Sequence, residues 1–193
     1  MNEQKILKKL QKRLSEDRIQ HVLAVKEDAV GLAEKYGVQK EKAKWAALLH
    51  DCAKELSNDI LLQKAEEFGI VIDNVFSNEP ELLHAPVGAE IAKREFGIKD
   101  SDILEAIRAH TLGSGDMSTL DKVIYLADHI EPNRSGNGID KLRKHIKNDI
   151  KGRNLDDAVR IACEDIIRYH LDLGEIIHPQ TVAARNSLLY DRE

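Results

Sequence analysis

Four kinds of feature are scarce in this sequence: aromatic residues, prolines, cysteines and long apolar runs. Aromatic residues make up 4% of the 193 residues, and there are only 4 prolines and 2 cysteines. Strands favour aromatic and β-branched side chains, whereas the abundant Leu, Ala, Lys and Glu lose little rotamer freedom in a helix. We therefore expect an all-α fold. No apolar stretch approaches the ~18 residues of a membrane-spanning helix, so no membrane partner is expected.

Runs of like charge are also missing. The formal net charge is −5, and no block of five or six like-charged residues occurs, which argues against nucleic acid as a partner. Cys52 and Cys163 form no CxxC pair and lie in helical patterns. Reduced, buried thiols are the usual state of such cysteines in cytoplasmic proteins. The amphipathic N-terminus has no signal-peptide core, and these features together predict a cytoplasmic location.

Apolar residues recur every three or four positions along most of the chain, which is the spacing of one helix face. Gly37 is expected to end a helix and Ser118 to begin one. The expected helices cover residues 3–14, 18–36, 39–54, 58–68, 86–96, 102–111, 118–129, 139–147, 155–173 and 179–190, with an irregular connection or short helix at 70–83. We expect one domain over residues 1–193, with a core at about 18–134 and C-terminal helices at about 139–190 packed on it.

Six potential metal ligands lie at helix ends or on inward faces. The chain has no HExxH, cysteine-based zinc or GxxxxGK phosphate motif. A charged carboxylate next to the apolar Ile124 and Ala127 is costly to bury unless it is paired or binds a cation. Imidazoles and carboxylates together suit a first-row divalent ion. The six residues are His21, His50, Asp51, His84, His110 and Asp128.

The order of four of these residues resembles a known signature. His21, the doublet His50-Asp51 and Asp128 are similar to the metal-binding set of the HD superfamily of phosphohydrolases. The segments LLHDCAKE, HAPVGAE, RAHT and MSTLDKVIYLADHIEPNR resemble one branch, the YqeK-type symmetrical bis(5'-nucleosyl)-tetraphosphatases, which hydrolyse diadenosine tetraphosphate. The resemblance spans residues 18–190, and only His129, after the Leu-Ala-Asp triplet, departs from the expected pattern.

This resemblance implies a function and a metal site. His21, His50, Asp51 and Asp128 would bind a divalent transition metal, with iron favoured and manganese, cobalt or zinc open. His84 and His110 would bind a second ion or contact phosphate directly, so one or two ions are expected. Metal-activated water would cleave diadenosine tetraphosphate symmetrically into two ADP. The partner is then a small nucleotide with ADP as product, and a homodimer is left open.

Further residues are expected to contact the substrate. Lys54, four residues after His50, and Arg134, after the helix-ending Pro132, are placed to stabilise phosphate charge. The hydroxyl of Thr111 would add a hydrogen bond. The expected catalytic set is Asp51, Lys54, His84, His110 and Arg134, and the expected substrate-binding set is His21, Lys54, His84, His110, Thr111 and Arg134.

Two alternatives stay open at this stage. The chain could be another HD phosphohydrolase, such as a nucleotidase or a guanosine-tetraphosphate hydrolase, or a nucleotide-binding regulator without turnover. The remaining histidines are expected to be exposed or packed, and His170 in particular to be packed on an apolar helix face. They are His129, His145, His170 and His178.

Overall fold

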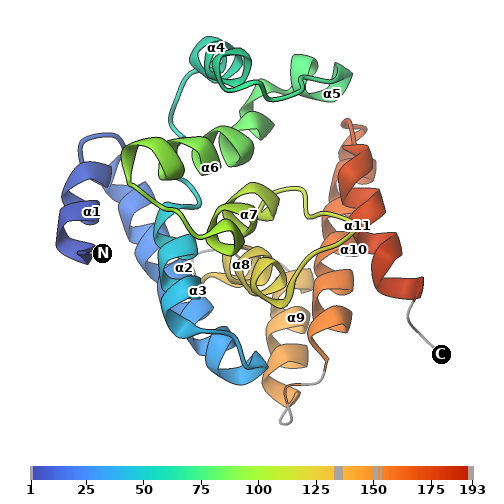
Figure 1. Cartoon of the computed structure of the whole chain (residues 1–193). Coiled ribbons are helices and arrows are strands. Elements are labelled where there is room, and N and C mark those ends of the chain that lie inside the picture. Colours follow the sequence, from blue (N-terminus) through green and yellow to red (C-terminus); the bar gives the residue numbers. More distant parts are fainter. Residues whose placement is uncertain (1, 133–136, 150–151, 153, 191–193) are drawn as a thin grey trace.

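The computed structural model describes residues 2–132, 137–149, 152 and 154–190, and every regular element among them is helical (Figure 1). This confirms the all-α expectation. The elements are α1 (Glu3–Leu10), α2 (Glu16–Tyr36), α3 (Lys40–Leu49), α4 (Asn58–Phe68), α5 (Asn74–Asn78), the 3-10 turn η1 (Pro80–Leu83), α6 (His84–Glu95), α7 (Ser101–Ala109), α8 (Thr119–Ile130), α9 (Asn137–Asn148), α10 (Leu155–Leu173) and α11 (Pro179–Tyr190).

Helix α8 occupies the centre of the arrangement. It contacts α2, α3 and α7 on one side and α9 and α10 on the other, and Figure 1 shows it between the blue N-terminal helices and the orange C-terminal ones. Its start is fixed by a capping box, in which the Ser118 side chain accepts from the Asp121 backbone and the Asp121 carboxylate accepts from the Ser118 backbone. Such reciprocal bonds satisfy two otherwise orphaned N–H groups, so the expected start is confirmed.

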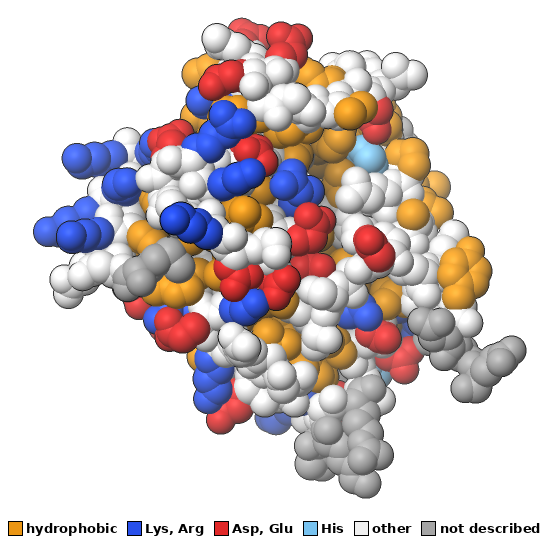
Figure 2. Space-filling view, viewed as in Figure 1, with side chains coloured by type: hydrophobic (Ala, Val, Ile, Leu, Met, Phe, Trp, Pro, Cys, Tyr) orange, Lys and Arg blue, Asp and Glu red, His pale blue; other side chains and the backbone are white. Residues whose placement is uncertain are grey.

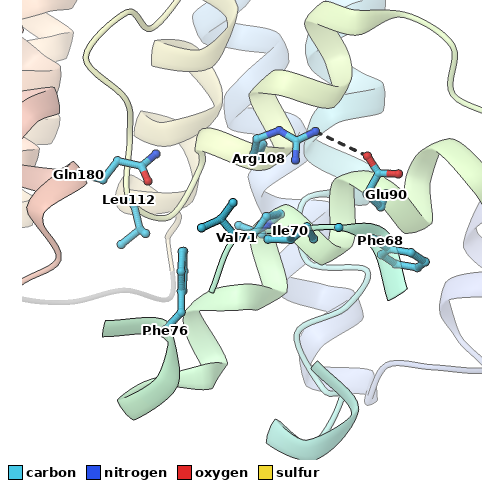
Figure 3. Close-up of a pocket in the computed structure, with 11 residues that line it drawn as sticks. Phe68, Ile70, Val71, Phe76, Glu90, Arg108, Leu112 and Gln180 are labelled. Atoms are coloured by element: carbon cyan, nitrogen blue, oxygen red, sulfur yellow. Dashed lines mark ion pairs between the residues drawn. The ribbon is translucent and has the colours of Figure 1, made fainter. Parts of the chain in front are cut away.

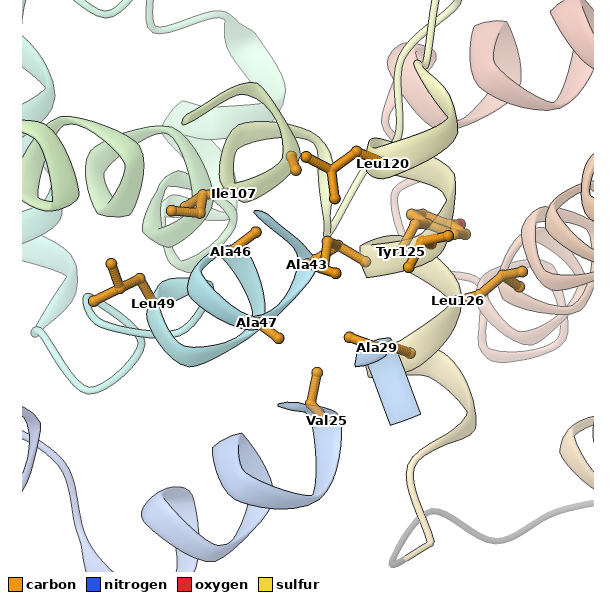
Figure 4. Close-up of a cluster of buried hydrophobic side chains, with 14 of the residues drawn as sticks. Val25, Ala29, Ala43, Ala46, Ala47, Leu49, Ile107, Leu120, Tyr125 and Leu126 are labelled. Carbon is orange, nitrogen blue, oxygen red and sulfur yellow. The ribbon is translucent and has the colours of Figure 1, made fainter. Parts of the chain in front are cut away.

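Small side chains let α3 pack closely against three other helices. Ala43, Ala46 and Ala47 are fully buried, and α3 contacts α2, α7 and α8. Figure 4 shows Ala47 facing Val25 on α2, Ala43 on the side of Tyr125, and Ala46 pointing towards Ile107, within one apolar cluster. Close packing at this junction brings the ends of the surrounding helices together, and those ends carry the polar residues singled out above.

The chain between α3 and α4 differs from the expected continuous helix. α3 ends at Leu49, five residues before the expected Lys54. The backbone then forms three-residue turns, with Cys52 N–H donating to Leu49, Lys54 to Asp51 and Leu56 to Ala53. These turns replace the i→i−4 bonds of an α-helix. As a result, the segment leaves the α3 axis directly after the helix and carries the His-Asp doublet at the bend.

The surface mixes both signs of charge. Figure 2 shows Lys and Arg interleaved with Asp and Glu on the face in view, with many of the basic side chains on the side where α1 lies. Within the part of the chain that is described, no helix is both long enough and apolar enough to cross a membrane.

Candidate metal centre

The six candidate ligands lie together although five different helices supply them. α2 carries His21, α3 is followed by His50 and Asp51, α6 begins at His84, α7 is followed by His110, and α8 carries Asp128. Four of them are almost completely buried, with exposed fractions of 0% for His50, 3% for Asp51, 2% for His84 and 3% for His110. A buried charge is unfavourable unless it is paired or binds a cation, so this cluster needs a charge-balancing partner.

One group of donor atoms gathers around Oδ2 of Asp51. His21 Nε2 lies 3.5 Å and His50 Nε2 3.3 Å from this oxygen. The two imidazole nitrogens are 3.3 Å apart. Asp128 Oδ1 completes the group, 3.1 Å from His21 Nε2 and 3.8 Å from His50 Nε2. Two nitrogens and two carboxylate oxygens thus face a common point.

A second group gathers around the other oxygen of the same carboxylate. Asp51 Oδ1 lies 3.5 Å from His84 Nε2 and 3.6 Å from His110 Nε2. These two nitrogens are 3.2 Å apart, and Thr111 Oγ1 is 3.1 Å from the first and 3.0 Å from the second. The second group therefore consists of two imidazoles and a carboxylate oxygen, with a hydroxyl beside them.

Asp51 belongs to both groups. Each group offers three ligand atoms within 4.8 Å of one another, His21 with His50 and Asp51 in one, and Asp51 with His84 and His110 in the other. Nitrogen and oxygen donors in this combination suit a first-row divalent metal ion. The donor set therefore fits the divalent metal binding that the sequence predicts. Because the Asp51 carboxylate faces both groups, it can donate an oxygen to an ion in one group or to an ion in each.

The electrostatics favour a deprotonated carboxylate. Burial by itself would raise the pKa of Asp51, but the adjacent His50, His110 and His84 hold it well below its usual range. Burial by itself would lower the pKa of His50, but the carboxylates of Asp51 and Asp128 raise that pKa above its ordinary value. An ionised carboxylate is the form that binds metal, whereas a raised histidine pKa makes protons compete with a metal for the same nitrogen.

The cluster opens into a cleft of about 890 Å³. His110, Thr111, Asp128 and Lys54 line it. The positive charge of Lys54 is, after burial, a main cause of the depression of the His84 pKa to about 3. Lys54 therefore acts electrostatically on the second group of ligands. Arg134, the other cation expected to meet phosphate, lies outside the described residues.

Helix α10 forms the opposite wall of the cleft. Ile166 and Tyr169 line it, and the Tyr169 side chain is exposed, at 61% of its reference area. His170 also lines the cleft, and its Nδ1 lies 2.9 Å from Glu175 Oε2. Its side chain is 34% exposed, so it is not packed on the apolar helix face as expected. His129 lines the cleft too, although it is largely buried, at 8% exposure.

Two residues of the site were missed by sequence reasoning. Arg18 Nη1 donates to Asp51 Oδ2 at 2.9 Å. Glu131 Oε1 lies 3.6 Å from His21 Nδ1. Arg18 is three positions before His21 on the same helix, a spacing that places two side chains on one face. That spacing was a usable signal for Arg18, whereas nothing in the sequence connected Glu131 with a histidine 110 positions earlier.

The sequence of this chain is similar to those of known proteins. The HD domain family model matches residues 18–133. The symmetrical bis(5'-nucleosyl)-tetraphosphatase of Halalkalibacterium halodurans is 39% identical over the full length of both chains, and the one from Bacillus subtilis is 36% identical over 98% of both.

A solved structure is also similar. The crystal structure of a Clostridium acetobutylicum protein, described as a predicted HD superfamily hydrolase involved in NAD metabolism, has a TM-score of 0.91 and 37% identity. The match covers 98% of this chain and 97% of that one. The chain therefore belongs to the HD domain family, as a phosphohydrolase of the type represented by the symmetrical bis(5'-nucleosyl)-tetraphosphatases.

Proposed function

We propose that this protein hydrolyses diadenosine tetraphosphate symmetrically, releasing two molecules of ADP. The observation that carries the proposal is the position of Asp51, whose two carboxylate oxygens face two groups of histidines beside an 890 Å³ cleft. A cleft of this size falls within the range of small-molecule sites. The full-length relatives named as symmetrical bis(5'-nucleosyl)-tetraphosphatases support the choice of substrate.

We assign the first group, His21, His50, Asp51 and Asp128, to one metal ion. His84 and His110 are assigned, with the second oxygen of Asp51, to a second ion or to direct contact with phosphate. When bound, divalent ions supply a water of lowered pKa and neutralise charge on phosphoryl oxygens. We favour iron, because histidine and carboxylate donors with open positions suit it, with manganese, cobalt and zinc as alternatives.

The cleft residues then act on the substrate itself. Lys54 supplies a positive charge beside His84, where the phosphate chain passes, and Thr111 offers a hydroxyl between His84 and His110. Phosphoryl transfer needs positioning and charge stabilisation more than covalent help. Replacing Lys54 with Met should therefore raise KM for diadenosine tetraphosphate about tenfold with metal content unchanged, and Lys54→Arg should restore part of the loss. Arg134 is proposed for the same role from its sequence position.

The wider setting of the protein also remains a proposal. We place its activity in the cytoplasm, since Cys52 and Cys163 are buried free thiols. The division into a core at 18–134 and packed C-terminal helices at 139–190 is supported by the contacts that α10 makes with α8.

The test is product analysis with purified protein and diadenosine tetraphosphate in the presence of Fe²⁺, Mn²⁺ or Co²⁺. Wild type should release two ADP per substrate, and Asp51→Asn should lose the activity. Asp59→Asn, which removes an exposed carboxylate on α4, is the matched control and should behave as wild type.

Three outcomes would contradict the proposal in different ways. AMP plus ATP would keep a hydrolase but reject symmetrical cleavage. Turnover of guanosine tetraphosphate or a mononucleotide, with none of the dinucleotide, would favour another HD phosphohydrolase. Nucleotide binding without turnover under each metal would favour a regulator.

A further inference from the structure

The histidines of the metal centre are held in two different ways. Three of them lie directly at the start or just after the end of a helix. In each case Nδ1 faces the carbonyl three residues earlier, which leaves Nε2 directed into the cluster. These pairs are His50 with Ala47 at 2.7 Å, His84 with Glu81 at 2.5 Å, and His110 with Ile107 at 2.7 Å.

His21 has no such arrangement. It lies inside α2, which continues for fifteen residues beyond it to Tyr36, so nearby carbonyls are used by the helix itself. Its Nδ1 faces the Glu131 carboxylate instead, at 3.6 Å. This distance is longer than a hydrogen bond and corresponds to an electrostatic contact. His21 is thus the one histidine of the four whose Nδ1 faces a side chain in the contacts described.

Glu131 is itself held in place at the end of α8. Its side chain is only 4% exposed. Arg143 donates through Nη2 to the Glu131 carbonyl at 2.6 Å and through Nε to the Ile130 carbonyl at 2.9 Å. Glu131 also follows Asp128 by three positions, so one helix end provides both a candidate ligand and the partner of another ligand. These two hydrogen bonds fix the backbone from which the Glu131 side chain extends, and they do not involve His21.

We propose that Glu131 is a positioning residue for His21. By attracting the proton to Nδ1, the carboxylate leaves the lone pair of Nε2 free for a metal ion held together with Asp51 and Asp128, and it makes the imidazole a stronger donor. Partners of this kind typically change metal affinity 10- to 100-fold. The inference rests on the metal assignment of the proposed function, and it does not depend on which nucleotide is hydrolysed.

The test measures Mn²⁺ affinity directly, by competition with a fluorescent chelator and without nucleotide. Glu131→Ala should weaken binding about 10- to 100-fold. Glu131→Gln should lose less, because the amide oxygen keeps a partial negative charge that faces Nδ1. Glu27→Gln, an exposed carboxylate on α2, is the control and should bind as wild type. The ¹⁵N chemical shifts of His21 in the metal-free protein should show less Nδ1-protonated tautomer in Glu131→Ala.

Wild-type Mn²⁺ affinity in Glu131→Ala, or an unchanged His21 tautomer, would overturn the proposal. If Glu131→Ala does not fold, Glu131→Gln decides the matter through the same two measurements. Failure of the proposed function would appear separately, as wild-type protein that binds Mn²⁺ but does not release ADP from diadenosine tetraphosphate.

A second, independent observation concerns a smaller cavity of about 330 Å³ (Figure 3). It borders the same two segments as the large cleft. Glu81 and Leu82 line the cleft and Ala85 and Pro86 line the cavity. Likewise, His110 and Thr111 line the cleft, and the neighbouring residue 112 lines the cavity. The segments that carry His84 and His110 therefore contribute to both spaces.

The chemistry of this cavity suits a purine nucleoside. Figure 3 shows Val71, Phe76 and Leu112 near one another, with Gln180 beyond Leu112. Val71 is an exposed apolar residue, at 83%. The Gln180 amide donates through Nε2 to the Gly113 carbonyl at 2.6 Å, which leaves its oxygen to accept from an exocyclic amino group. Glu90 and Arg108 also line the cavity and form an ion pair at 3.8 Å (Figure 3). Small-molecule sites typically combine apolar walls with a few oriented polar groups, and 330 Å³ lies at the small end of their range.

We infer that the cavity receives the second nucleoside of the dinucleotide, while the large cleft receives the first. This deepens the proposed function, because symmetrical cleavage leaves one ADP on each side of the metal centre. The test titrates ADP into metal-loaded protein by calorimetry. Wild type should bind two ADP per chain and Val71→Asp one. Ile60→Asp, which adds the same charge at an exposed apolar position on α4 away from both cavities, should still bind two.

One ADP per chain in wild type, or two in Val71→Asp, would overturn the second inference. Both results are obtained without turnover. They are therefore distinguishable from a failure of the proposed function, which product analysis measures.

Discussion

His84 and His110 face each other across the metal centre with their Nε2 atoms 3.2 Å apart. The two residues lie 26 positions apart in the chain, one at the start of α6 and the other after the end of α7. Each has its Nδ1 occupied by a backbone carbonyl, so neither ring can turn its free nitrogen away without breaking that contact. The pair is thereby organised to act together on a single ion or phosphate oxygen.

The first prediction concerns the number of metal ions. His110→Ala removes one of the two imidazoles beside Asp51 Oδ1, so metal analysis should show a fall from two ions per chain to one. His170→Ala, at the cleft rim, should leave the count unchanged. A count of one in wild type would instead assign His84 and His110 to phosphate alone.

A second prediction follows from the charge around His50. Its pKa is raised above 6.5, against the effect of burial, by the carboxylates of Asp51 and Asp128. A proton therefore competes with a metal ion for the Nε2 atom of His50 even above pH 6.5, and a metal ion that binds there must displace that proton. Mn²⁺ affinity in chelator competition should keep rising as the pH increases from 6 to 8. An affinity that is flat over this interval would contradict the expectation.

The third prediction tests Arg18. Its hydrogen bond to Asp51 Oδ2 is charge-assisted, and the Asp51 side chain is only 4% exposed. Removing one partner of such a bond costs about 1–3 kcal/mol. Chemical denaturation of metal-free Arg18→Ala should show a loss of that order in the free energy of unfolding, and a smaller loss with saturating Mn²⁺. Arg168→Ala, an arginine exposed on α10 at 65%, serves as the control. Equal losses with and without Mn²⁺ would argue against coupling between Arg18 and the metal site.

The fourth prediction concerns the thiols. Burial raises the pKa of Cys52 to about 12 and also raises that of Cys163. Because the thiolate is the reactive form, neither cysteine should react with Ellman's reagent at pH 8 in the native protein, and both should react in guanidinium chloride. Rapid reaction of one native thiol would show that the segment carrying it opens locally.

The sequence by itself determined the helices and the identity of the candidate ligands. Apolar spacing predicted the long helices well, since it reports which face is buried, and the expected helix at 155–173 coincides with Leu155–Leu173. Ser118 and Gly37 are cap residues in the structure as expected. Caps depend on local hydrogen bonds and backbone angles, which neighbouring residues decide.

Only the tertiary structure decided how the ligands are grouped. The division of Asp51 between two sets of histidines depends on where five helices meet, and no spacing along the chain carries that information. The contact of Arg18 with Asp51 and that of Glu131 with His21 have the same origin. Each is a contact between residues that lie far apart in the chain. The packing of buried side chains, rather than local propensity, sets the distance between such residues.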